Sequence, residues 1–126
     1  MNIEDSRKQL RESGIQKSEI EKLLDAIEKT LNTLFDEFEI ECTNPDEATE
    51  YIHEVLLQQI IEISESNEKI TLAEQFEKIN SDYTDPQSET AKISTVFLLG
   101  VTSNSTKIDS INELSEEILK KKYVNQ

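Results

Sequence analysis

Between the first glycine and the first proline of the chain, apolar residues recur at alternating steps of four and three positions. This spacing gives one face of an amphipathic helix, with the seven-residue period of a heptad pattern. Leu23 and Phe35 widen that face, as is typical of a helix inside an intramolecular bundle. Ser18 and Glu21 have the spacing of a capping box, so we expect the helix to begin at Ser18 and to end near residues 40–43. The positions that define this heptad face are Ile20, Leu24, Ile27, Leu31, Leu34 and Phe38.

Capping signals and apolar spacing predict further helices on both sides of this one. Asn44 and Pro45 form a strong start signal, because Asn caps helices well and Pro suits the first helical position. Thr71 with Glu74 gives a second capping box. Apolar residues cover more than one face of the helix that follows Pro45, so we expect it to be the most buried helix. The further helices are expected at residues 2–14, 45–64, 71–83, 86–100 and 110–122.

The segment from Ile93 to Thr102 is open to two interpretations. Its β-branched residues suit a buried strand. The sequence offers no second strand with which it could pair, so we favour a buried helix that begins at Asp85 and Pro86. Glycine and proline occur only twice each, and 126 residues is the size of one ordinary domain. The predicted fold is therefore all-α, a compact bundle of about five to six helices in a single domain.

Negative charge is concentrated in one stretch of the chain. The sequence has 27 acidic and 13 basic residues, a net charge of −14. The 39 residues from Thr30 to Glu68 contain eleven acids and no lysine or arginine, whereas an even spread of 13 bases over 126 residues would place about four there. Clustered charge of one sign opposes folding by self-repulsion and attracts a surface of the opposite sign. The eleven acids are Asp36, Glu37, Glu39, Glu41, Asp46, Glu47, Glu50, Glu54, Glu62, Glu65 and Glu68.

We predict that most of these acids form a protein-binding surface. Acids recur every three or four positions in the helix that follows Pro45, which places them on its outer side as an acidic ridge. The short connection to the preceding helix predicts an antiparallel hairpin whose tip carries further acids. Tyr51 and Phe35 are candidate aromatic anchors. The predicted partner-binding residues are Asp36, Glu37, Glu39, Glu41, Asp46, Glu47, Glu50, Tyr51, Glu54, Glu62 and Glu65.

Evenly spaced carboxylates on rigid helices resemble, in charge and size, the surfaces of immunity proteins that plug nuclease toxins and of DNA-mimicking inhibitors. The resemblance covers no motif. The first hypothesis is an acidic helical inhibitor or immunity protein that binds a basic protein partner, a toxin or nuclease domain. The same charge disfavours direct binding of nucleic acid or of an anionic membrane. The alternative is a structural or regulatory protein that self-associates through the heptad face. A monomer and a homodimer both stay open.

No catalytic or metal-binding constellation is complete in the sequence. Glu50 and His53 have the Glu-x-x-His spacing of carboxylate-bridged di-iron helices, but such a centre needs the motif twice and His53 is the only histidine. Cys42 and His53 lack a third, orienting group for nucleophilic catalysis. Residues 80–85 resemble half of a calcium loop but have Asp85 where that loop requires glycine. We therefore predict no enzyme, no cofactor and no metal.

The sequence also indicates a compartment. Cys42 is the only cysteine and cannot form an internal disulfide, and the first residues lack the apolar core of a secretion signal. The longest apolar run, from Val96 to Val101, is too short to cross a bilayer. We expect a reducing, cytoplasmic location.

Overall fold

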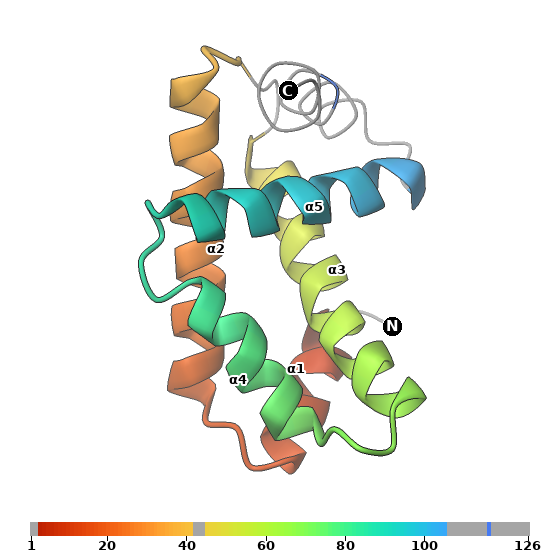
Figure 1. Ribbon diagram of the computed structural model, residues 1–126. Coiled ribbons are helices and arrows are strands. Elements are labelled where there is room, and N and C mark those ends of the chain that lie inside the picture. Colours follow the sequence, from red (N-terminus) through yellow and green to blue (C-terminus); the bar gives the residue numbers. More distant parts are fainter. Residues whose placement is uncertain (1–2, 42–44, 106–115, 117–126) are drawn as a thin grey trace.

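The described part of the chain folds into helices. A computed structural model describes residues 3–41, 45–105 and 116, and within these ranges it contains five helices and no strand (Figure 1). The all-α prediction is confirmed, and the segment from Ile93 to Thr102 is helical. Asn2, the predicted cap of the first helix, lies outside the described residues, as does the expected helix at 110–122 apart from Glu116. The helices are α1 (Ile3–Glu12), α2 (Lys17–Glu37), α3 (Pro45–Ser66), α4 (Leu72–Asp82) and α5 (Glu89–Ser105).

All five helices contribute to one hydrophobic core. α2 and α3 run in opposite directions, and α5 packs across both of them, whereas α1 and α4 pack against α3 toward the other end of the molecule (Figure 1). The heptad face of α2 lies inside this core. Ile27, Leu31 and Leu34 have no accessible surface, so the prediction of a bundle helix with an internal apolar face is confirmed.

The burial of α3 and α4 differs from the sequence-based expectation. α3 has seven buried residues and α2 has nine, so the prediction that α3 is the most buried helix is wrong. The physical reason is that a polar row runs along the outer side of α3. The apolar spacing of the sequence predicts a core position for Ile63, but its side chain is 43 % exposed. In α4 the same kind of spacing predicts that Ala73, Phe76 and Ile79 face inward. Phe76 is buried, whereas Ala73 is exposed.

Gly14 ends the first helix, as the sequence predicts. Its φ of +95° lies in the left-handed region that favours glycine. The N–H of Gly14 donates to the carbonyl of Arg11 at 3.0 Å, and the N–H of Ile15 donates to the carbonyl of Leu10 at 3.2 Å. These paired bonds form a Schellman motif, and the burial of Leu10 and Ile15 supplies its hydrophobic contact. The motif turns the chain directly into α2.

α2 begins earlier than the predicted capping box. Gln16 is the cap residue, and its carbonyl accepts the backbone N–H of Ile20 at 3.2 Å. Ser18 already lies inside the first turn, so the predicted start at Ser18 is wrong. Glu21, the other member of the expected box, forms an ion pair with Arg7 of α1 instead. That pair joins α1 to the beginning of α2.

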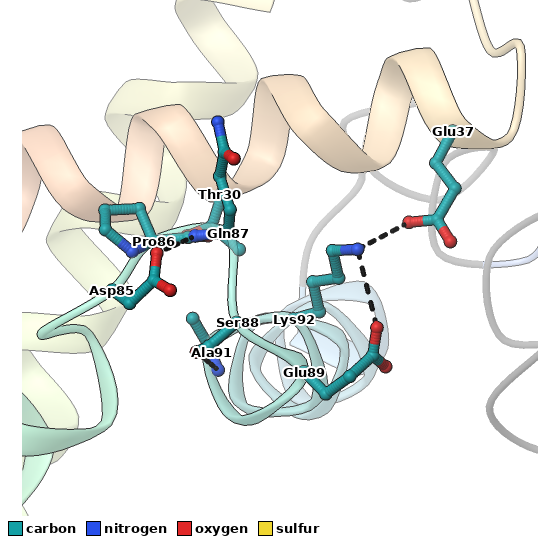
Figure 2. Close-up of polar contacts among 9 residues, drawn as sticks. All are labelled: Thr30, Glu37, Asp85, Pro86, Gln87, Ser88, Glu89, Ala91 and Lys92. Atoms are coloured by element: carbon teal, nitrogen blue, oxygen red, sulfur yellow. Dashed lines mark hydrogen bonds and ion pairs between the residues drawn. The ribbon is translucent and has the colours of Figure 1, made fainter.

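The turn before α5 is bonded to α2. The Asp85 carboxylate accepts the backbone N–H of Gln87 at 3.0 Å. The hydroxyl of Thr30, buried on α2, donates to the Pro86 carbonyl at 2.8 Å (Figure 2). The helix that follows is Glu89–Ser105, and the N–H of Lys92 donates to the Ser88 carbonyl, so Pro86 lies before the first helical turn. The expected helix start at Asp85 and Pro86 is therefore wrong.

α5 begins at Glu89 and is capped by Ser88. The Ser88 hydroxyl accepts the backbone N–H of Ala91 at 3.1 Å, and its carbonyl accepts the N–H of Lys92 at 3.1 Å. The helix also extends to Ser105, five residues beyond the predicted end at residue 100.

Candidate protein-binding surface

Exposed carboxylates gather at the junction of α2 and α3. The connection between the end of α2 and the start of α3 is short, so both helix ends lie at one end of the molecule (Figure 1). The exposed acids of this junction, without Glu37, which pairs with Lys92, make up what we call the acidic end: Asp36, Glu39, Glu41, Asp46, Glu47 and Glu50. The structure thus brings together most of the predicted partner-binding residues.

The basic residues of the described ranges lie elsewhere, with one exception. Eight of the nine lysines and arginines at 3–41 and 45–105 are found in α1, in the first thirteen residues of α2, or between residues 69 and 78. The ninth is Lys92. Within the same ranges, no lysine or arginine lies within ion-pair distance of Asp36, Glu39, Glu41, Asp46 or Glu50. The charge of these five acids is therefore not compensated by the described bases.

Lys92 compensates Glu37. Its Nζ lies 3.2 Å from the Glu37 carboxylate and 3.5 Å from that of Glu89, one turn earlier on α5 (Figure 2). Only 14 % of the Lys92 side chain is exposed. The hydrogen bond to Glu37 raises the pKa of Lys92 above its ordinary value. Glu37, one of the predicted partner-binding residues, thus links α2 to α5 through an ion pair. Because Lys92 neutralises its charge, Glu37 attracts a cationic partner less than the neighbouring acids do.

Glu39 has a backbone conformation that favours glycine. Its φ is +54°, in the left-handed region. The N–H of Glu39 donates to the carbonyl of Asp36 at 3.2 Å, and that of Ile40 donates to the carbonyl of Phe35 at 2.9 Å, so α2 ends in a second Schellman motif. A residue with a side chain in this conformation costs about 1–2 kcal/mol. A carboxylate therefore occupies a position where glycine would give the more stable turn.

The acids of α3 continue away from the acidic end. Residues four apart on a helix lie one above another, so every fourth residue forms a row along α3. The acidic row consists of Glu50, Glu54, Gln58 and Glu62. The amide of Gln58 donates to the Glu62 carboxylate at 3.1 Å. Glu65 lies beyond this row, accepts a hydrogen bond from Gln9 of α1 at 3.3 Å, and stands about 27 Å along the helix from Glu47.

The two aromatic candidates differ in accessibility. Phe35 is buried, with 9 % of its surface exposed, so it is not available as an anchor for a partner. Tyr51 is half-buried and packs against the core beside the acidic row. The aromatic side chain that sequence reasoning missed is Phe97 on α5, which is 75 % exposed. Its apolar neighbours in the sequence predicted a buried helix, and they give no signal that Phe97 itself points outward.

Two titratable groups, the half-buried His53 and the buried Tyr83, have structural partners. The ring Nε2 of His53 lies 3.0 Å from the Leu24 carbonyl, and burial lowers the pKa of His53 below its ordinary value of 6.5. The hydroxyl of Tyr83 lies 2.9 Å from that of Thr95, and burial raises the pKa of Tyr83 to about 12. Both groups are uncharged near neutral pH and join neighbouring helices.

Two hollows of the described surface are lined mainly by charged and polar residues. One of them, of about 400 Å³, lies between α1 and the start of α2, where Arg7, Arg11 and Lys17 stand beside two glutamates. Typical small-molecule sites are instead mostly apolar. Among the described residues, no group of three or more His, Cys, Asp and Glu side chains is arranged to hold a metal ion. No described helix has the length and apolar content needed to span a bilayer.

Comparisons of the chain with models of protein families, with curated proteins and with solved structures find no significant match.

Proposed function

We propose that this protein is an acidic helical inhibitor that binds and neutralises a basic protein partner, as an immunity protein binds its toxin. The observation that carries the proposal is the acidic end, where exposed carboxylates from two helices lie together and the described lysines and arginines, except Lys92, lie elsewhere. Carboxylates held on rigid helices attract a cationic surface before contact and pair with its lysines and arginines after contact.

The backbone at Glu39 supports the proposal independently of charge counting. An acid in a left-handed conformation lowers the stability of the turn, and such strained positions concentrate at functional sites. Glu39 is exposed and directly follows the cap of α2, so its carboxylate is accessible to a partner that meets the acidic end. A requirement for binding at Glu39 explains why a less stable residue is present there.

The alternative function, self-association through the heptad face, finds less support. Ile20, Leu24 and Ile27 are at most 2 % exposed within a single chain, and α3 and α5 cover the helix that carries them. Self-association would therefore have to use another surface.

Capture from an extract of the source cell tests the proposal, with two variants of equal charge. In the first, Glu47, Glu50 and Glu54 are all changed to Lys. In the matched control, the exposed acids Glu12, Glu68 and Glu77, which lie far from the acidic end, are changed to Lys. Both variants change the net charge by the same amount, so they separate a local surface from overall charge.

The proposal predicts that the wild-type protein and the control capture the same basic protein, that the first variant does not, and that moderate salt weakens the capture. Circular dichroism of each variant confirms that the helices are retained. Equal loss of capture in both variants would mean that total charge, and not the acidic end, governs binding, and the proposal would fail.

A further inference from the structure

Two apolar side chains form an exposed strip on α5, on the side of the molecule that also carries the acidic row of α3. Ile93 and Phe97 are four residues apart, so their side chains lie one above the other on the helix. They are 50 % and 75 % exposed, the highest values among the large apolar side chains of the described ranges. Single exposed apolar residues need no explanation, but neighbouring ones often belong to a binding surface.

α3 continues this strip. Tyr51, Val55, Gln59 and Ile63 form a row between the acidic row and the buried row of Ile52, Leu56 and Ile60. The first two residues of the intermediate row are half-buried, and Ile63 is 43 % exposed. The order across α3 is therefore carboxylates, then a partly apolar row, then the core. α5 packs on the core side, which places Phe97 next to the intermediate row.

A groove lies where these elements meet. It has a volume of about 200 Å³, below the roughly 300–1,000 Å³ of typical small-molecule sites, so its size suits side chains of another protein better than a cofactor. Leu56 and Gln59 form its α3 wall, and Phe97 and Leu98 form its α5 wall. α4 closes the groove with Ile79 and the carboxylate of Asp82.

We propose that this groove binds the apolar face of a cationic amphipathic helix of the partner. The occupant follows from the charge beyond the α3 wall: the acidic row lies past Gln59, and no described lysine or arginine lies within ion-pair distance of Glu54 or Glu62. Asp82 adds a carboxylate on the α4 side, where Lys78 stands one turn before it. A helix with apolar residues at spacings of three and four would place them along Phe97 and Ile63, while its flanking lysines or arginines would reach Glu54 and Glu62. The inference rests on the proposed function. It adds Phe97 as an aromatic anchor to an interface that the proposed function describes only by its carboxylates.

A labelled synthetic peptide tests the inference on the full chain. The probe is an 18-residue helix of leucine and lysine with one apolar face, and its control is a scrambled peptide of the same composition and charge. Fluorescence anisotropy at physiological salt gives the Kd of each peptide. We expect the patterned peptide to bind at least about tenfold more tightly than the scrambled one, and Phe97→Ser to remove that difference. Phe97→Leu should largely restore it.

The outcomes distinguish binding in the groove from attraction to the acidic end and the acidic row. If reversal of Glu47, Glu50 and Glu54 weakens binding of both peptides but Phe97→Ser changes the affinity of neither peptide, the carboxylates attract cations and the groove proposal is overturned. If Phe97→Ser removes the peptide preference and charge reversal has no effect, the groove binds helices and the proposed function fails. Absence of any preference between the two peptides also overturns the inference.

Two other occupants would be revealed by the same variant. A fall of several degrees in the melting temperature of Phe97→Ser would show that the chain itself covers Phe97. Sedimentation of wild-type protein as a dimer that Phe97→Ser dissociates would show that a second copy covers it. Either result contradicts a groove that is free for a partner.

Discussion

Ser6 is a buried polar residue without a hydrogen-bond partner. Its side chain has no accessible surface, and no acceptor or donor of the described residues lies within reach of its Oγ. A buried hydroxyl without a partner loses its bonds to water and gains none in return. We therefore expect Ser6→Ala to raise the free energy of unfolding by about 1 kcal/mol. Urea denaturation measures the change.

Ser88 provides the matched control for Ser6. The same substitution at Ser88 removes the cap of α5, because its Oγ accepts the N–H of Ala91. Ser88→Ala should lower the free energy of unfolding by about 1 kcal/mol. Changes of the same sign in the two variants would contradict the hydrogen bonding described for these two hydroxyls.

Glu39 should show opposite effects on stability and on binding. Glu39→Gly relieves the left-handed strain, so we expect the free energy of unfolding to rise by about 1 kcal/mol. The same change removes a carboxylate from the acidic end, so capture of the basic partner should weaken. Denaturation and capture are measured on one protein. A variant that is more stable and binds equally well would remove Glu39 from the interface.

His53 is the only histidine of the chain, so NMR can follow the titration of its ring without overlap from another histidine. Burial lowers its folded pKa below 6.5, the value expected in the unfolded chain. Between these two pKa values the unfolded state holds more protons, so the free energy of unfolding falls as the pH drops below about 6.5 and levels off below the folded pKa. In His53→Gln this part of the pH dependence should disappear. An NMR pKa at or above 6.5 would contradict the burial of the ring.

At the scale of the helices, the sequence predicted the buried faces of helices better than the residues at which helices begin. The heptad face of α2 is buried as its spacing indicates, because apolar burial follows directly from the 3.6-residue period. The predicted starts of α2 and α5 were wrong because each start depends on a contact outside the helix itself, either with a preceding turn or with a residue distant in the sequence. The Schellman turn at Gly14 sets the first, and Thr30, 56 positions before Pro86, influences the second.

The contact between Thr30 and Pro86 should stabilise the junction of α2 and α5. The Thr30 hydroxyl lies 2.8 Å from the Pro86 carbonyl and 2.9 Å from the Ala26 carbonyl of its own helix. Thr30→Val keeps the shape of the side chain but leaves the part-buried Pro86 carbonyl without this donor, so we expect a loss of about 1 kcal/mol in the free energy of unfolding. Thr33→Val is the control, because the Thr33 hydroxyl bonds only to the Lys29 carbonyl of its own helix. Equal losses in the two variants would show that the bond to Pro86 adds nothing.

At the scale of the whole molecule, the charge pattern of the sequence predicted where the acids gather on the surface. It did not predict which acid forms an ion pair with a lysine. The window without bases maps to the junction of α2 and α3 and to the outer side of α3, since the end of α2 and all of α3 lie within it. Two features depend on tertiary contacts and left no local signal. Lys92 reaches Glu37 across 55 positions, and the turn of α5 exposes Phe97 while it buries Val96 and Leu98.

The separation of charge predicts how association with the captured partner depends on salt. Attraction between an acidic end and a cationic surface acts over roughly 10 Å at 0.1 M salt, so it accelerates encounter at low ionic strength and fades as salt is added. Rates of dissociation should change less with salt, because they depend more on the packed contacts of the interface.

Stopped-flow association with the captured partner therefore tests the central claim most directly. At low salt, reversal of Glu47, Glu50 and Glu54 should slow association by about tenfold or more, whereas reversal of Glu12, Glu68 and Glu77 should slow it far less. At high salt the three proteins should converge. Equal rates for wild-type protein and the first variant at low salt would contradict the claim that the acidic end meets a cationic surface.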